Sequence, residues 1–239
     1  TDRGAIAEPD VAARVLGQAL GESLKTSVVI ENKGGAHGTV GITEAMRAPA
    51  DGYTLMMGSI GTMAINPSLY SKLPYHPLRD FQPVTLMSTV PLFLAVNPGF
   101  AAQTAGELVK LAKASPGKIT YGSAGSGVTS HLTMELFKHT QSIDLTHVPY
   151  KGSPAAVTDL IGGQVNAMID TGPALLPHMR SGKVRVLAVA SRQRNAAAPQ
   201  VPTMAEAGLG DFEAPAWVGL AAPQGPPKDV IAVLSKAFV

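Results

Sequence analysis

The chain has 239 residues, of which 45% are hydrophobic and 15% are charged. This composition is typical of one or two compact globular domains and argues against disorder. The 19 basic residues nearly balance the 17 acidic ones, so charge gives no indication of binding to nucleic acid or to an anionic membrane. The absence of cysteine excludes disulfides, cysteine-zinc sites and thiol catalysis, and no apolar run approaches the roughly 20 residues of a membrane helix.

The first third of the chain alternates helical and extended patterns. Apolar residues at helical spacing predict a helix from Asp10 to Leu24, with an apolar stripe of Val11, Ala12, Val15, Leu16, Leu20 and Leu24. A buried strand at Val28–Glu31 and a glycine-rich turn at Lys33–Gly38 are expected to follow. A second helix is expected from Val40 to about Arg47, and a second strand at Tyr53–Gly58. Helix, strand, helix and strand in this order predict a parallel sheet with crossover helices.

An extended segment separates this block from the next. Ile65–Phe81 is rich in proline, and Val84–Val96 is rich in residues that favour strands. A segment of this kind between two α/β blocks often crosses from one lobe to another. The second block then begins with a helix at Thr104–Ala114, in which Thr104 is the expected N-cap and Glu107 has the capping-box spacing.

The stretch Ile119–His131 carries the first functional hypothesis. It predicts a short strand at Ile119–Tyr121, a turn rich in glycine and hydroxyl residues, and the first turn of a helix. Glycine allows positive φ and a close approach of a ligand to the main chain. The first amides of a helix lack internal partners, and the helix dipole favours negative charge there. The stretch therefore predicts a site for a small anion, with a plain strand-to-helix connector as the alternative.

A second unit of the same kind follows. The strand Leu145–Tyr150 leads into a helix at Ala155–Ile161, with Ser153 as the expected N-cap and Pro154 at the first helical position. Lys151 in this turn could bind an anion or be an ordinary surface lysine. Two such helix starts in one lobe favour binding of a carboxylate or a phosphate.

The remaining elements complete the second block and return to the first. Val165–Asp170 predicts a strand that ends in an aspartate, and a helix is expected at Ala174–Met179. Val184–Ala190 predicts a further strand, and Phe212–Ala222 an extended return segment. A last amphipathic helix is expected after Pro226.

Other kinds of site fit the sequence less well. The glycine-rich segment Gly34–Gly41 matches neither common nucleotide-loop motif. His131, Glu135 and His139 share one helix face, but they lie too far apart along it to bind one metal ion without a second element. No nucleophile elbow of the G-x-S-x-G kind is present. Asp170 could be a general base, a cap or a ligand acceptor.

Two blocks of strand-turn-helix units predict a two-lobed α/β protein with a ligand cleft between the lobes. Ligands of such sheets bind beyond the carboxyl ends of the strands. Four segments are expected there: Ser59–Thr62, Gly122–His131, Tyr150–Ser153 and Asp170–Thr171.

A series of short blocks in a fixed order carries a family resemblance. They are Val28–Asn32 with its glycine turn, Ala50–Leu55, Ile65–Tyr70, Leu73–Tyr75 with Asp80 and Phe81, Tyr121–Gly125, Ser130–Leu132, His147–Gly152, Asp159–Gln164, Val201–Thr203, Glu206–Gly208, and Trp217 with Gly219. These blocks extend over nearly the whole chain from about Asp10. They resemble the substrate-binding proteins of tripartite tricarboxylate transporters, the TctC or Bug family.

The resemblance implies a periplasmic solute-binding receptor of the Venus flytrap type, with a type II-like periplasmic-binding-protein fold and a mainly parallel sheet in each lobe. It implies a small carboxylate ligand, namely a di- or tricarboxylate, an amino acid or an aromatic acid, and delivery to the membrane permease subunits of the transporter. We expect a monomer without a cofactor, a metal or an enzymatic activity. The alternative is an enzyme that acts on a small carboxylate with Asp170 and His131.

The resemblance also implies a set of ligand-binding residues. By motif matching these are Ser59, Gly61, Thr62, Ser123, Gly125, Ser126, Thr129, Ser130, His131, Tyr150, Lys151, Gly152, Asp170 and Thr171.

The expected lobes are 1–98 with 222–239 for the first and 99–221 for the second. Members of the family begin with a strand and a loop that forms one pocket wall, and Thr1–Pro9 does not match that loop. The family also continues beyond Val239. The first lobe is therefore expected to be incomplete at both ends, and a signal peptide is expected upstream in the full gene product.

Overall fold

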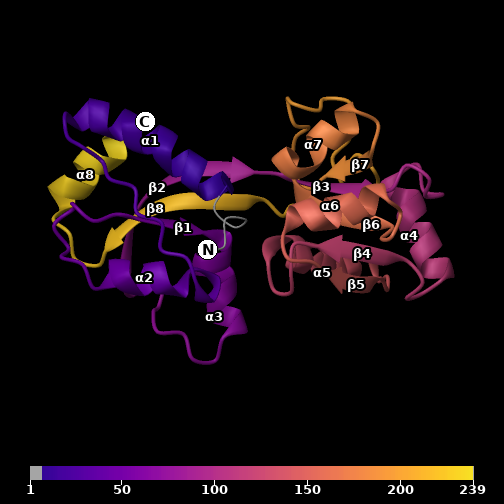
Figure 1. The fold of residues 1–239 in the computed structure, drawn as a ribbon, viewed down its shortest axis with the longest axis horizontal. Helices are drawn as coiled ribbons and strands as arrows, with labels where there is room; N and C mark the ends of the chain where they lie inside the picture. The colour runs from indigo at the N-terminus through magenta and orange to yellow at the C-terminus, as the bar shows by residue number, and fades with distance from the viewer. Residues whose placement is uncertain (1–6, 239) are drawn as a thin grey trace. The chain divides into compact units, whose positions relative to one another are not determined.

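The computed structural model describes the backbone of residues 7–238 and, apart from position 37, the side chains from residue 13 onward. The chain forms two compact units (Figure 1). Unit 1 comprises the described residues up to Thr89 and from Trp217 onward, and unit 2 is the uninterrupted stretch Val90–Ala216. The ligand cleft expected between the two lobes stays a prediction.

Unit 2 is built on a five-stranded sheet with the order β5-β4-β6-β3-β7. The strands are β3 (Leu92–Val96), β4 (Thr120–Ser123), β5 (Thr146–Pro149), β6 (Ala167–Thr171) and β7 (Arg185–Val189). β4 is parallel to β5 and β6, as predicted for this lobe. β3 is antiparallel to both of its neighbours, β6 and β7, so the sheet is mixed.

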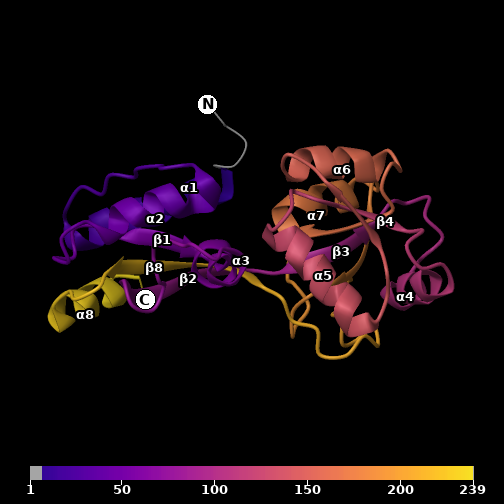
Figure 2. The same ribbon diagram turned by 90° about the horizontal axis from the view of Figure 1, so that it is seen from below.

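Helices cover both faces of this sheet (Figure 2). α4 (Ala105–Ala114) and α5 (Thr129–Gln141) pack on one face, and α6 (Ser153–Ile161) and α7 (Gly172–Arg180) on the other. The central strand β3 is apolar throughout and serves both layers. Leu92, Leu94 and Val96 lie in the α4 and α5 core, whereas Phe93 and Ala95 lie in the α6 and α7 core. This is the alternation expected of a strand that is buried on both sides.

The start of α4 was predicted correctly from its sequence. The Thr104 side chain accepts a hydrogen bond from the Glu107 amide (3.1 Å), and the Glu107 side chain accepts one from the Thr104 amide (3.3 Å). Each group satisfies an amide that the helix itself leaves without a partner, so the capping box is complete.

Unit 1 is built on a three-stranded sheet with the order β1-β8-β2. The strands are β1 (Met56–Ser59), β2 (Phe81–Val90) and β8 (Ala216–Pro223). β8 comes from the end of the chain and inserts between the two early strands (Figure 1). β1 and β8 are antiparallel, so the parallel pattern predicted for the first lobe is wrong for this pair.

Six helical segments accompany this sheet in the described part of unit 1. They are α1 (Ala7–Leu24), the short turn η1 (Ala36–Gly38), α2 (Thr39–Met46), the π-helical turn η2 (Gly61–Ile65), α3 (Asn66–Leu69) and α8 (Lys228–Lys236). The predicted helices at 10–24 and 40–47, and the one after Pro226, correspond to α1, α2 and α8. Leu20 is buried, but Val15, predicted on the apolar stripe of α1, is 63% exposed. The stripe's Val11 and Ala12 side chains lie outside the described residues.

The strand predicted at Val28–Glu31 is wrong. The segment has no regular secondary structure and joins neither described sheet, and Val29 is 78% exposed. Its alternate residues face α1 instead, because a Cβ added at Gly17 would lie within 3.3 Å of both Val28 and Ile30. The alternation of apolar residues in this segment therefore reflects its packing against α1, not pairing with another strand.

Two boundaries also differ from the prediction. β1 begins at Met56 and not at Tyr53, which lies in a turn where its amide donates to the Asp51 side chain (3.0 Å). The lobe boundaries after residue 98 and at residue 222 are shifted, because β3 is hydrogen-bonded within the sheet of unit 2 and β8 within that of unit 1.

Candidate functional site

Three neighbouring parallel strands of unit 2 end at one edge of its sheet. β5, β4 and β6 are adjacent and run in the same direction, and α6, α5 and α7 follow them in the chain. Because neighbouring strands lie about 4.8 Å apart, their carboxyl ends and the helix starts that follow come together. We call this the cradle edge, defined by Ser123–His131, Tyr150–Ser153 and Asp170–Thr171.

Hydrogen bonds join the three turns of the cradle edge to one another. The Tyr150 amide donates to the Ser123 carbonyl (3.0 Å), and the Gly152 amide donates to the Ala124 carbonyl (3.0 Å). On the other side, the Ser153 hydroxyl donates to Oδ2 of Asp170 (2.6 Å). The three turns therefore form one connected structure.

The contact of Ser153 corrects its predicted role. Gly152, with a φ of 110°, is the N-cap of α6, and Ser153 is the first helical residue. The Ser153 hydroxyl is used to bind Asp170, whose Oδ1 also accepts the Thr171 amide (2.7 Å). Asp170 thus holds the start of α6 next to the end of β6.

None of the three helix starts has a side-chain cap. The N-caps of α5, α6 and α7 are Val128, Gly152 and Thr171, and none makes a side-chain capping hydrogen bond. No acidic residue lies in the first turn of any of them. Since α6 and α7 each carry a proline in their first two positions, α5 has the most amide donors at its start.

The turn before α5 owes its shape to two glycines. Gly125 has a φ of 148° and Gly127 a φ of 78°, values that disfavour other residues. A Cβ at Gly125 would also lie 3.4 Å from the Tyr150 carbonyl oxygen. The Ser130 hydroxyl accepts the Ala124 amide (3.1 Å), and Nδ1 of His131 accepts the Gly127 amide (3.0 Å). Ser130 and His131 of α5 thus hold the preceding turn in place.

The structure brings eleven of the predicted site residues together on the cradle edge. They are Ser123, Gly125, Ser126, Thr129, Ser130, His131, Tyr150, Lys151, Gly152, Asp170 and Thr171. Among them Ser126 and Lys151 are exposed, whereas Ser123, Ser130 and Asp170 are buried. Whether they contact a ligand stays a prediction.

The other three predicted residues lie in unit 1. Ser59 ends β1, and its amide donates to Oγ1 of Thr62 (3.0 Å), while Gly61 begins η2. The Tyr75 hydroxyl donates to the Thr62 carbonyl oxygen (2.5 Å), which anchors this turn to the small core of unit 1.

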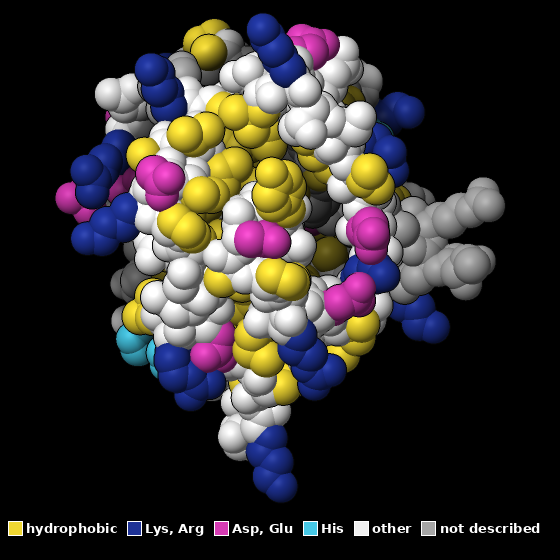
Figure 3. Space-filling model, turned by 90° about the vertical axis from the view of Figure 1, so that its left-hand side faces the viewer, with side chains coloured by type: hydrophobic (Ala, Val, Ile, Leu, Met, Phe, Trp, Pro, Cys, Tyr) yellow, Lys and Arg dark blue, Asp and Glu magenta, His cyan; other side chains and the backbone are white. Residues whose placement is uncertain are grey.

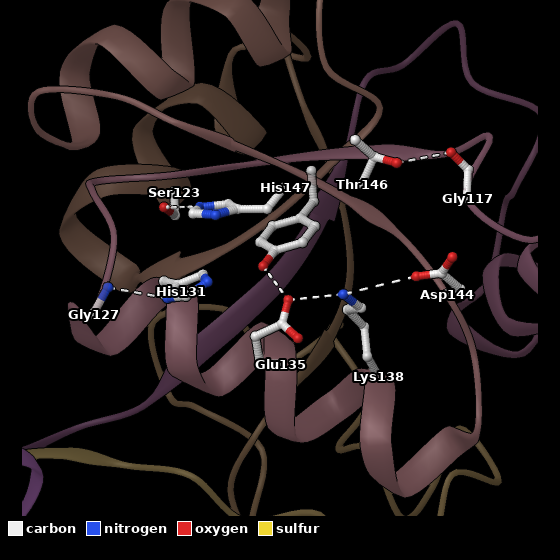
Figure 4. A network of polar contacts seen from close by, with 10 residues as sticks. Gly117, Ser123, Gly127, His131, Glu135, Lys138, Asp144, Thr146 and His147 are labelled. Atoms are coloured by element: carbon white, nitrogen blue, oxygen red, sulfur yellow. Dashed lines mark hydrogen bonds and ion pairs between the residues drawn. The ribbon is translucent and has the colours of Figure 1, made fainter. Parts of the chain in front are cut away.

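The structure also adds residues that the sequence analysis did not select. His147 on β5 lies beside Tyr121 on β4 in parallel register, and its Nε2 is 2.7 Å from the Ser123 hydroxyl. The Tyr121 hydroxyl donates to Glu135 of α5, which also accepts Lys138 Nζ (2.8 Å) (Figure 4). The sequence feature that could have pointed to His147 is its position two residues before the end of β5. A lone histidine in a strand does not by itself indicate a functional role.

These groups alter one another's ionisation. Burial, together with the nearby charge of His131, lowers the pKa of His147 below the ordinary value of 6.5. Burial acts to raise the pKa of Glu135, but hydrogen bonds from Lys138 and Tyr121 outweigh it and lower that pKa. Burial and the hydrogen bond to Asp159 raise the pKa of Tyr150 to about 12. The network therefore favours the ionised form of Glu135 and the neutral form of His147.

Metal-binding side chains do not cluster in the part of the chain that the structure describes. No group of three or more histidine, aspartate or glutamate side chains there could hold a metal ion. Within residues 7–238, no helix has the length and apolarity needed to cross a membrane.

Comparison with known proteins identifies the family. A model described as the tripartite tricarboxylate transporter family receptor, TctC, matches residues 12–239. BugT of Bordetella pertussis is 40% identical over 228 residues, which cover 95% of this chain and 70% of BugT. The chain spans 66% of the length of two further relatives.

Solved structures agree with this match. An R. palustris protein solved with adipate is 34% identical with a TM-score of 0.84, and the match covers 100% of this chain and 79% of that one. MatC from Rhodopseudomonas palustris, solved with bound malate, is 33% identical with a TM-score of 0.80, and the match covers 100% and 80%. The solved relatives include periplasmic binding proteins, and the predicted two-lobed α/β fold class is confirmed. The chain belongs to the TctC family of tripartite tricarboxylate transporter receptors, which includes the Bug proteins.

Proposed function

We propose that this protein is a periplasmic receptor that binds a small carboxylate and delivers it to the membrane permease subunits of a tripartite tricarboxylate transporter. The observation that carries the proposal is the cradle edge, where three helices start side by side without a side-chain cap. Backbone amides and hydroxyls at such a place bind an anion without a cationic side chain in the core. Two relatives were solved with dicarboxylates, adipate and malate.

The start of α5 is the position that suits the ligand carboxylate best. Asp170 already accepts the amide at the start of α7 and the hydroxyl at the start of α6, so these two donors are already in use. The first turn of α5 has no acidic residue, and its hydroxyls Thr129 and Ser130 come with two glycines before them. Each charge-assisted amide contact there contributes roughly 1.5–3 kcal/mol.

The two residues of the enzyme alternative make structural contacts within the cradle edge. Nδ1 of His131 accepts the Gly127 amide, and its ring stacks on His147. Asp170 accepts hydrogen bonds from Ser153 and Thr171. These contacts support a receptor without turnover. Asp170→Asn tests this, because an enzyme would lose product formation while it still bound the acid, and a receptor has no turnover to lose.

Titration calorimetry with a panel of di- and tricarboxylates, amino acids and aromatic acids tests the binding function. We expect saturable binding of at least one carboxylate, starting with adipate and malate as probes. Saturable binding of a neutral sugar, with none of the carboxylates bound, would show that the proposal is wrong.

A pair of charge-matched variants locates the ligand. Lys151→Gln removes an exposed positive charge from the cradle edge, and Lys113→Gln removes one from the last turn of α4. We expect Lys151→Gln to weaken carboxylate binding by up to about fivefold, the range for a solvated ionic contact. Lys113→Gln should change it little. Equal effects of the two variants would mean that only the net charge matters and that the cradle edge is not the site.

Delivery and location have their own tests. A signal peptide upstream of this sequence in the full gene product, followed by recovery of the protein from the periplasmic fraction, is the expected result. Uptake of the bound acid should stop when the receptor gene or the permease genes are deleted.

A further inference from the structure

Three aromatic rings form a stack beneath the glycine turn of unit 2. His147 stacks on Tyr121 with ring centroids 4.8 Å apart and on His131 with centroids 4.0 Å apart, and the planes differ by 20° and 21°. The three residues come from β5, β4 and α5. Both imidazoles contact the turn, one at Ser123 and the other at Gly127 (Figure 4). The stack therefore supports the turn at two points.

The contact of His131 fixes the position of its proton. The Gly127 amide donates to Nδ1 (3.0 Å), so Nδ1 must carry a lone pair and the neutral ring must carry its hydrogen on Nε2. Protonation of the ring would place a hydrogen on Nδ1, opposite the Gly127 N–H. The hydrogen bond would be lost, and two like dipoles would face each other across the turn.

The contacts of Ser123 fix the proton of His147 in a similar way. The Ser123 hydroxyl donates to the Gly125 carbonyl (3.0 Å) and accepts the Gly125 amide (3.2 Å). A hydroxyl has only one hydrogen, so the 2.7 Å contact with Nε2 of His147 is satisfied when Nε2 donates. His147 thus orients the hydroxyl that closes the turn at Gly125.

Four charged or titratable side chains surround the stack of imidazoles. Tyr121 donates its hydroxyl to Glu135, and Glu135 pairs with Lys138, which lies 4.0 Å from Asp144. Burial raises the pKa of the Tyr121 hydroxyl, and Lys138 helps to lower the pKa of Glu135. Histidine is the side chain whose ordinary pKa lies between pH 5 and 8, so we attribute the pH dependence to the imidazole contacts.

We propose that His131 and His147 are positioning residues that hold the glycine turn in the shape that receives the ligand carboxylate, and that His131 does so only while Nδ1 is unprotonated. The inference rests on the proposed function, because it concerns how the cradle edge is kept ready for its ligand. Neither imidazole needs to contact the ligand. Acidification then weakens binding through the turn, in addition to any protonation of the ligand itself.

Nitrogen NMR of the ligand-free protein tests the structural part without any ligand. At about pH 8, where histidine is neutral, we expect both imidazoles to carry their hydrogen on Nε2. The hydrogen-exchange rate of the Gly127 amide is compared at the two pH values after correction for the intrinsic pH dependence of exchange. The corrected rate should be higher at about pH 5.5 than at about pH 8. A hydrogen on Nδ1 of neutral His131, or no change at Gly127, would overturn the proposal.

Calorimetry with the acid that binds in the screen, beginning with adipate and malate, tests the functional part. His131→Asn keeps an acceptor near the position of Nδ1 but does not titrate, and His131→Phe keeps a flat ring without the acceptor. Between about pH 8 and about pH 5.5 the unmodified protein should lose about fivefold more affinity than His131→Asn, the equivalent of one hydrogen bond. His131→Phe should bind more weakly at both values.

Two matched variants complete the design. His139→Asn changes an exposed imidazole at the far end of α5 and should keep the pH profile of the unmodified protein. His147→Gln keeps a donor near the position of Nε2, and His147→Phe keeps only the ring, so His147→Phe should bind more weakly. Identical pH profiles for the unmodified protein and His131→Asn would overturn the proposal.

The design separates the two proposals. If no carboxylate binds the unmodified protein while the NMR results are as expected, the proposed function is wrong and the positioning of the turn by the two histidines stands. If a carboxylate binds with a pH profile that His131→Asn does not alter, the proposed function stands and the role of the histidines is wrong.

Discussion

The two units differ in how their sheets are covered. The sheet of unit 2 lies between two helix layers, and eleven of the twelve largest fully buried side chains in the described part of the chain belong to this unit. In unit 1 the corresponding core is a small cluster around Ile42, Met56, Tyr75, Phe81 and Ala221. Unit 2 therefore holds most of the hydrophobic stabilisation, which grows with the apolar area removed from water.

The surfaces show the same contrast. Of the eleven exposed large hydrophobic side chains among the described residues, ten lie in unit 1, including Tyr53 at 92% and Leu78 at 82% exposure. Figure 3 shows one face on which hydrophobic side chains are spread between charged ones. Exposed apolar groups contribute nothing to folding until something covers them. We therefore expect unit 2, which carries the cradle edge and is continuous in sequence, to be the more stable unit.

The strongest test of this comparison removes unit 1 altogether. A fragment of residues 90–216 contains every strand and helix of unit 2. We expect it to be monomeric and to unfold cooperatively on heating, as single domains of this size generally do. Circular dichroism and calorimetry measure this. A fragment without a cooperative transition would show that unit 2 depends on unit 1.

A pair of core substitutions tests whether the units unfold separately. Phe137→Ala removes a fully buried ring of unit 2 that packs edge-on against Phe212, and Phe81→Ala removes one of unit 1 that packs on Tyr75. Each should cost about 3–5 kcal/mol of unfolding free energy in its own unit. In urea unfolding followed by hydrogen exchange, each variant should shift only the transition of its own unit. One shared transition that both variants shift equally would contradict the comparison.

The stability of unit 2 should fall on acidification in a window set by His147. Its pKa is lowered in the folded protein, so the unfolded chain takes up a proton first, and stability falls as pH drops below about 6.5 toward the lowered value. Glu135, whose pKa is also lowered, extends the loss to lower pH. Urea midpoints measured from pH 8 downward should decrease less in His147→Gln than in the unmodified protein. Parallel curves would mean that His147 is not responsible.

The smallest expected effect concerns one helix start. Thr104→Ala removes the hydroxyl of a complete capping box and should cost about 1 kcal/mol in unit 2. Ser153→Ala is the matched variant, because the Ser153 hydroxyl binds Asp170 and caps no helix. It should lower the stability of unit 2 and also alter carboxylate binding, whereas Thr104→Ala should leave binding unchanged.

Much of the local structure could be predicted from the sequence. The capping box at Thr104 and Glu107 depends on residues three apart in one helix, and the glycines at 125 and 127 mark their turn because other residues rarely adopt its backbone angles. The order of strands and helices in unit 2 followed from hydrophobic period and turn chemistry. Each of these features depends on neighbours within a few positions.

Features that depend on distant partners could not be predicted. Val28–Glu31 has the composition of a strand, but a strand exists only where another strand pairs with it, and here the segment packs on α1. The Ser153 hydroxyl looked like a cap, and Asp170, seventeen positions later, accepts its hydrogen bond instead.

By itself, the sequence determined the family, the strand-turn-helix units and the position of the glycine turn, because these depend on residue type at short spacing. Only the tertiary structure placed His147 under that turn, since the parallel pairing of β4 with β5 sets His147 beside Tyr121 and within 2.7 Å of Ser123. It also showed that most of the largest fully buried side chains among the described residues lie in unit 2. Burial and pairing are properties of contacts between distant segments, and no local pattern specifies them.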